Sequence, residues 1–118
     1  MYQALALSYN LPVAYIVNTL GIDKAFEFGQ KFGLDMENVE KVLGASIGSG
    51  VETNPLQMAQ AYSVFANDGV MKDAHLITSI ETASGKVLVQ HRETSTKVID
   101  RSVADKMTSM MLGTYTNG

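Results

Sequence analysis

The sequence predicts a mainly helical α+β fold with one β-hairpin and a helix near its C-terminus. Residues 2–66 carry apolar side chains at helical spacing, interrupted by Gly, Asn and Pro. Residues 75–91 change to a β-type pattern and are rich in β-branched side chains. From Asp100 onward the helical spacing returns, with apolar side chains at Val103, Met107, Met110 and Met111. Gly113, Asn117 and Gly118 are expected to lead out of this last helix.

The composition is that of one small, ordered globular domain. The chain has 118 residues, of which 46% are hydrophobic and 8% aromatic. The net charge of −3 comes without a basic stripe or a polybasic run, so the sequence does not indicate binding to nucleic acid or to an anionic membrane surface. Cys is absent, which excludes disulfides and thiolate metal sites.

The N-terminus has no charged region followed by an apolar stretch, so it is not a signal peptide. No apolar run reaches the roughly 18–20 residues that a membrane span requires. Because the residues from Tyr2 onward already favour helix, we expect the chain to begin inside a structural element and to be part of a longer domain.

The first predicted helix, residues 2–7, breaks at the tripeptide Ser8-Tyr9-Asn10. Asn10 is a favourable N-cap for a second helix, and Pro12 is tolerated in its first turn. Gly21 suits the C-terminal end of this helix. Its buried stripe is expected at Val13, Ile16, Val17 and Leu20.

A third helix is expected to start at the cap Asp23 and to end at Gly33, with Phe26, Phe28 and Phe32 as its apolar bulk. Residues 36–43 predict a further short helix, and the Gly-rich residues 44–50 predict a loop.

The strongest helix start lies at residues 54–57, where Asn54 can cap, Pro55 suits the first helical position and Gln57 can complete a capping box. Residues 67–69 (Asn-Asp-Gly) end this helix. Residues 75–80 and 86–91 then predict the two strands of a hairpin, and residues 82–85 predict its turn.

Ser8 and Asn10 are the candidate functional residues, because a hydroxyl and a carboxamide on one exposed corner can relay a proton and hold a substrate amide. Ser-x-Asn is a short pattern that occurs by chance in roughly one chain in three. The alternative is a helix junction in which Asn10 only caps the second helix. The surrounding sequence therefore has to decide between the two.

Residues 2–6 and 11–14 resemble the helix–loop–helix around the second motif of penicillin-binding transpeptidases. Residues 54–62 (NPLQMAQAY) resemble the family's T-P-L-x-M-A-x-A-Y stretch, except that Asn54 separates Thr53 from the Pro. Residues 65–69 (FANDG) are similar to its F-A-N-x-G helix end, and the hairpin follows in the expected place. The ordered set looks most like the class A, bifunctional branch.

The resemblance implies the helical subdomain of a β-lactamase/transpeptidase-like fold and acyl transfer through a serine, without a metal or an organic cofactor. Three motifs meet in that family's site, and Ser-x-Asn is one of them. By resemblance, Ser8 is the relay hydroxyl and Asn10 holds an amide of the peptide donor or of a β-lactam. Tyr9 occupies the variable position and receives no role.

The family's other two motifs are absent from the chain: no Ser has Lys three positions later, and no Lys precedes Ser/Thr-Gly. We therefore expect residues 1–118 to be a partial transpeptidase domain, with Ser-x-x-Lys upstream of Met1 and Lys-Ser/Thr-Gly downstream of Gly118. The isolated piece is expected to be inactive.

Further expectations concern partners and location. The resemblance implies that the complete domain acts on peptidoglycan stem peptides and reacts with β-lactams, outside the cytoplasm, in a parent anchored to the cell membrane by a segment that this chain lacks. The C-terminal methionines could form an exposed apolar patch and favour self-association.

Two rival hypotheses come from other classes. The first is a non-catalytic helical interaction module in which Ser8-Tyr9-Asn10 is only a helix cap. The second is an independent serine hydrolase that uses His75 or His91, but the sequence has no nucleophile elbow to support it. Each His stands alone at a predicted strand end, without a metal-ligand spacing, and is expected to be structural.

Overall fold

A computed structural model describes residues 1–117, and it confirms the predicted mainly helical α+β fold. The predicted exit from the last helix at Gly118 lies outside the described residues. The elements follow one another as α1 (Tyr2–Ala6), α2 (Asn10–Leu20), α3 (Ile22–Lys31), η1 (Leu43–Ile47, a 3₁₀ helix), α4 (Pro55–Ala66), β1 (Val70–Lys72), β2 (Ser79–Glu81), β3 (Val87–Gln90), β4 (Ser95–Lys97) and α5 (Arg101–Asn117).

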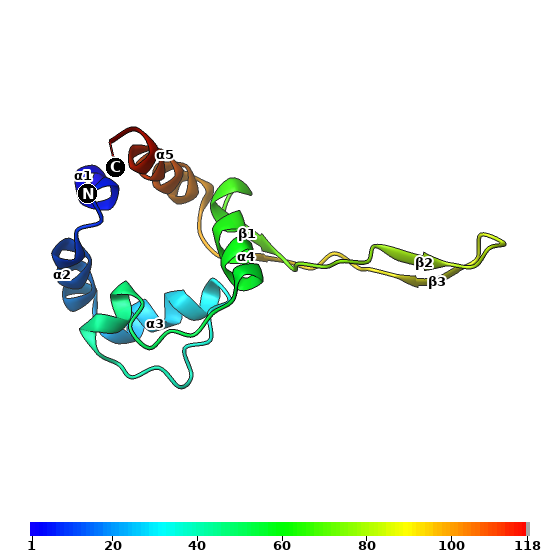
Figure 1. The fold of residues 1–118 in the computed structure, drawn as a ribbon, viewed down its shortest axis with the longest axis horizontal. Helices are drawn as coiled ribbons and strands as arrows, with labels where there is room; N and C mark the ends of the chain where they lie inside the picture. Colours follow the sequence, from blue (N-terminus) through cyan, green and yellow to red (C-terminus); the bar gives the residue numbers. More distant parts are fainter. Residues whose placement is uncertain (118) are drawn as a thin grey trace.

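The α-helices follow one another around a ring, and a long β-ribbon projects away from it (Figure 1). The two ends of the chain meet in this ring, because α1 packs against α5. On the opposite side α2 packs against α3 and η1, while α4 contacts both β1 and α5. The molecule measures 60 × 35 × 23 Å along its principal axes, so the ribbon makes it strongly elongated.

The capping box that the sequence predicts at the start of α4 is present. The Gln57 backbone N–H donates to Asn54 Oδ1 at 2.9 Å, and the Asn54 backbone N–H donates to Gln57 Oε1 at 3.2 Å. Gly21 ends α2 as predicted, with φ of 93°. The predicted cap at Asp23 is wrong, since Gly21 occupies the N-cap position of α3 and Asp23 lies in its first turn.

The short helix predicted over residues 36–43 does not form. The Asp35 carboxylate accepts the backbone N–H of Glu37 at 3.0 Å, and this local bond competes with a helical start. Met36 instead packs with Phe26 and Ala45 in a hydrophobic cluster. A helical turn forms later, as η1, within the stretch that the sequence predicts to be a loop.

The ribbon contains the predicted hairpin and one more strand pair. Strands β2 and β3 pair antiparallel as the predicted hairpin, although both are shorter than expected. The structure places Ile80 opposite Val89, and a register shift follows Ile80. Strands β1 and β4 also pair antiparallel, with Val70 opposite Lys97. The sequence does not predict this second pair, because three-residue strands carry too little alternation to be recognised.

The core is small and entirely apolar over residues 1–117. Val64 of α4 and Ala104 of α5 are fully buried, and the other buried residues are Val17, Phe26, Met36, Ala45 and Ala61. The predicted stripe on α2 is only partly covered, since Leu20 remains 57% exposed. The accessible surface is 8662 Å², whereas a compact monomer of this mass exposes about 6,300 Å². The projecting ribbon accounts for part of this excess. Apolar helix faces are also uncovered within this chain, as shown by the exposed side chains of Leu11, Tyr15 and Leu56.

Helix α5 is longer than the sequence predicts. The sequence predicts that Gly113 leads out of the helix, but the helix runs to Asn117. A Cβ built at Gly113 would lie 3.6 Å from the Cβ of Ala6, so α1 passes close to α5 at this glycine. This packing of the first helix against the last compensates the weak helix propensity of Gly.

Gly69 is the glycine whose replacement should harm the fold most. It has φ of +86°, and an added Cβ would collide with the backbone carbonyl of Ile99. We expect Gly69→Ala to lower the free energy of unfolding by about 2–4 kcal/mol, because strain and a backbone clash add together. Urea denaturation of the purified protein measures this change.

Gly85→Ala is the matched control. Gly85 has a similar φ of +82° but no atom within 4 Å of the added Cβ. This variant should lose only about 1 kcal/mol, from the left-handed conformation alone. Equal losses in the two variants would contradict the role assigned to the Ile99 carbonyl.

Candidate functional site

The junction between α1 and α2 is a left-handed turn at Ser8. The Tyr9 N–H donates to the Ala4 carbonyl at 2.8 Å, and the Ser8 N–H donates to the Leu5 carbonyl at 3.1 Å. These two bonds form a Schellman motif, which satisfies the last carbonyls of α1 and places Ser8 at C′. Ser8 has φ of 54°, in a region where Gly is the usual residue. A non-glycine residue therefore holds a strained position at this corner.

The predicted cap at Asn10 is wrong. The N-cap position of α2 is occupied by Tyr9, and no side chain makes a cap hydrogen bond there. Asn10 is already the first helical residue, so its carboxamide extends from the start of α2 instead of folding back onto it. The interaction module that rests on a cap at residues 8–10 loses its structural basis.

The polar side chains of the tripeptide are free within the part of the chain that the structure describes. Over residues 1–117, neither the Ser8 hydroxyl nor the Asn10 carboxamide has a hydrogen-bond partner, and both residues are exposed. Tyr9 between them is 51% exposed. A donor–acceptor pair with no internal partner on a strained turn is available to a ligand or to another polypeptide segment.

Two hollows flank the tripeptide. One, of about 510 Å³, is lined by residues 8–12 alone. The other, of about 230 Å³, adds α1 on one side and Ser46 and Ile47 of η1 on the other. We call the second hollow the junction pocket. Its wall from η1 was not predicted, because those two residues lie far along the chain and carry no motif.

A third cavity, of about 480 Å³, lies away from this corner, between α3, η1 and the start of α4. It is lined mainly by apolar side chains, among them Phe26, Met36 and Met58. Neither Ser8 nor Asn10 reaches it. This third cavity is therefore a gap in the small core and is separate from the polar corner.

The structure brings the two histidines together, contrary to the expectation that each stands alone. Their rings stack with centroids 3.8 Å apart, and His75 Nδ1 lies 3.3 Å from the Asp73 carbonyl oxygen. His91 Nε2 is buried without a hydrogen-bond partner over residues 1–117. Stacked rings direct their nitrogen lone pairs in parallel planes, a poor arrangement for holding one ion between them. No group of three or more metal-ligating side chains occurs in residues 1–117.

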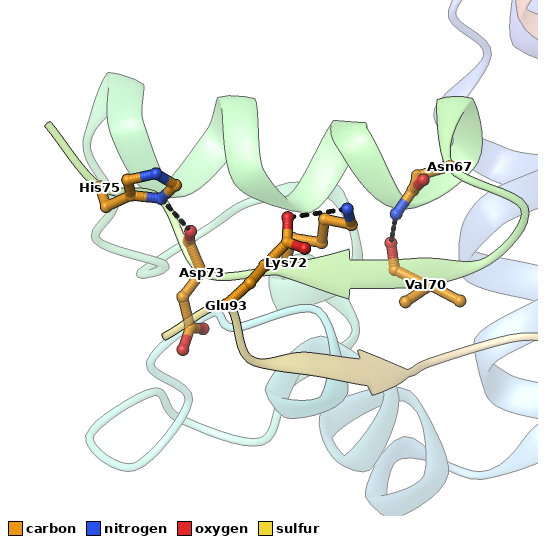
Figure 2. A network of polar contacts seen from close by, with 6 residues as sticks. All are labelled: Asn67, Val70, Lys72, Asp73, His75 and Glu93. Atoms are coloured by element: carbon orange, nitrogen blue, oxygen red, sulfur yellow. Dashed lines mark hydrogen bonds and ion pairs between the residues drawn. The ribbon is translucent and has the colours of Figure 1, made fainter. Parts of the chain in front are cut away.

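His75 belongs to a polar network at the base of the ribbon (Figure 2). There Lys72 Nζ lies 2.8 Å from Glu93 Oε1, and Asn67 donates to the Val70 carbonyl at 2.9 Å. The hydrogen bond from Lys72 lowers the pKa of the Glu93 carboxyl below its ordinary value of 4.5. All of these groups connect the strands to α4 or to each other, so the network is structural and not catalytic.

The chain belongs to the penicillin-binding protein transpeptidase domain family: the family described as "Penicillin binding protein transpeptidase domain" matches residues 1–118. This match confirms the resemblance drawn from the sequence and favours it over the interaction module. No helix within residues 1–117 combines the length and apolarity that crossing a membrane would take.

Individual relatives agree with the family. Penicillin-binding protein 2a of Streptococcus pneumoniae is 66% identical over all of this chain, which spans 16% of that protein's length. Penicillin-binding protein 1A of Haemophilus influenzae superposes with a TM-score of 0.69 at 30% identity. The superposition covers 78% of this chain and 14% of the Haemophilus influenzae chain.

The penicillin G acyl-enzyme complex of penicillin-binding protein A from Mycobacterium tuberculosis superposes with a TM-score of 0.86 over 98% of this chain and 31% of its own. At 20% identity this likeness is one of fold. The predicted transpeptidase-type fold is thus confirmed, and the chain spans about a sixth of the length of the first curated relative.

The strain at Ser8 has a measurable consequence. We expect Ser8→Gly to be about 1 kcal/mol more stable than Ser8→Ala, because Gly adopts positive φ at no steric cost while Ala keeps the strain. Thermal or urea denaturation of the two variants measures the difference. Equal stability would mean that the turn at Ser8 is not left-handed in solution.

The pH dependence of the ribbon follows from Glu93. The Lys72 contact lowers the pKa of Glu93 in the folded protein, so it stabilises the fold only while Glu93 is ionised. This contribution to the free energy of unfolding is present above pH 4.5 and is lost as the pH falls below that value. The protection factors of amides in β1 and β4, which correct for the intrinsic exchange rate at each pH, should therefore fall more steeply on acidification in the wild type than in Glu93→Gln. The Gln variant keeps the side-chain shape but cannot titrate. Parallel pH profiles would contradict the assignment.

Proposed function

We propose that this chain is part of a serine-type D,D-transpeptidase domain that crosslinks peptidoglycan stem peptides and is acylated by β-lactams. The observation that carries the proposal is the strained Ser8 turn with its unpartnered hydroxyl and carboxamide, in a chain of the transpeptidase family. Polar groups held in place before a ligand arrives are what acyl transfer requires.

Within this proposal Ser8 relays a proton and Asn10 holds an amide of the acyl donor. A hydroxyl can accept and donate at once, so Ser8 can pass a proton between a nucleophile–lysine pair and the leaving amine. The Asn10 carboxamide can donate to a donor carbonyl and accept from a donor N–H. The acylated serine and its lysine lie on a Ser-x-x-Lys motif outside this chain, and a Lys-Ser/Thr-Gly strand completes the site.

The uncovered apolar faces support the proposal that residues 1–118 are a partial domain. The chain exposes 8662 Å² of surface, and about a quarter of this exceeds what a compact monomer exposes. Further segments of the same protein would cover these faces, whereas the isolated chain would use them for self-association. The parent acts outside the cytoplasm and is held at the membrane by a segment elsewhere in its sequence.

The function is tested on the complete protein that contains this chain. A fluorescent penicillin should label the wild type covalently, and Ser8→Gly and Asn10→Ala should slow labelling by about 10²–10³-fold, as losses of a proton relay and of a positioned hydrogen bond. The isolated chain of residues 1–118 should not be labelled, because it has no nucleophile motif.

Asn18→Ala is the matched control for Asn10→Ala. Asn18 lies on the same helix, is exposed and does not line either hollow beside Ser8. This variant should be labelled at the wild-type rate. Normal labelling of Ser8→Gly and Asn10→Ala, or covalent labelling of the isolated chain, would overturn the proposed roles.

A further inference from the structure

We propose that Ile47 of η1 is a specificity-determining residue, which contacts the apolar side chain of the acyl donor while Asn10 holds the donor's amide. This inference rests on the proposed function and adds a residue that carries no family motif. It starts from the junction pocket, which η1 lines together with Ser8 and Asn10.

The pocket joins polar and apolar walls. Ser8 and Asn10 supply its free polar groups, while Leu5, Val13 and Ile47 supply aliphatic surface. Its volume of about 230 Å³ suits one substituent of a ligand and not a whole peptide. Such a site fits a donor in which an amide and an aliphatic or aromatic group are adjacent. The amide then contacts the polar wall, and the apolar group contacts the aliphatic wall.

The part of the pocket wall that η1 supplies is anchored to the hydrophobic core. Ala45 is 7% exposed and packs into the cluster with Phe26 and Met36, which anchors η1 to the core. The Gly48 N–H donates to the Ala45 carbonyl at 3.1 Å, and the Ser49 N–H donates to the Gly44 carbonyl at 3.1 Å. A turn fixed by packing and by backbone bonds can position a side chain without reorganising when the ligand binds.

Ile47 is the side chain that this anchored turn presents to the pocket. It is 51% exposed, and its β-branched side chain has restricted rotamers. Its neighbour Ser46 also lines the pocket, but the Ser46 hydroxyl donates to the Leu43 carbonyl at 2.6 Å within the same turn. Ser46 therefore stabilises the wall, and Ile47 is left to make the ligand contact.

Two penicillins separate the contact from the amide interaction. One carries a phenylacetyl side chain and the other an acetyl side chain, so both keep the amide and differ only in apolar bulk. In the complete protein, Ile47→Ala should lower the second-order acylation rate for the phenylacetyl compound by about three- to tenfold, and for the acetyl compound by less than about twofold. Ile47→Val should give a smaller loss in the same direction.

Leu43→Ala is the matched control. Leu43 lies on the same turn and is 44% exposed, but it does not line the pocket. It should leave the ratio of the two acylation rates unchanged. If Ile47→Ala slows both penicillins equally, or neither, the residue is a structural wall or a bystander and the inference is wrong. If Ile47→Ala does not fold, Ile47→Val decides by the same ratio.

The wild type distinguishes the two levels of the argument. Labelling of the wild type with an unchanged ratio in the Ile47 variants removes the specificity role and leaves the proposed function intact. Failure of both penicillins to label the wild type removes the proposed function, and the role of Ile47 falls with it.

Discussion

The left-handed turn at Ser8 is the constraint on which the arrangement of this chain depends. The turn ends α1 through two backbone hydrogen bonds and starts α2 two residues later, so it sets the angle at which two packing units meet. On one side α1 packs against α5, and on the other α2 packs against η1 and α3. A glycine would relieve the strain, but it would also remove the hydroxyl from the corner. The conflict between stability and a polar side chain is typical of functional sites.

The small core gives the site its second physical property. Burial is concentrated at Val64 and Ala104, where α4 meets α5, and at the cluster around Phe26. The cluster reaches the site through Ala45, whose burial anchors the wall of the junction pocket. The core therefore does more than hold the helices together, because it fixes residues of η1 that line the same pocket as Ser8 and Asn10.

The ribbon follows a different principle. Its two short strand pairs have little apolar burial, and they are connected by a network of ion pairs, hydrogen bonds and stacked histidines. Two-stranded ribbons are only marginally stable in water, so such cross-strand contacts matter more here than in a larger sheet. Individually these exposed contacts are weak.

The sequence by itself determined the elements whose signals are local. The capping box at Asn54, the end of α2 at Gly21 and the hairpin turn depend on neighbouring residues, and the ordered family motifs identified the transpeptidase family. Only the tertiary structure decided that η1 forms within the predicted loop, where Ala45 packs against Phe26 and Met36, and that Ile47 lines the same pocket as Ser8 and Asn10. These features arise from contacts between residues far apart in the chain. Local propensity and periodicity describe only neighbouring residues, so they do not predict such contacts.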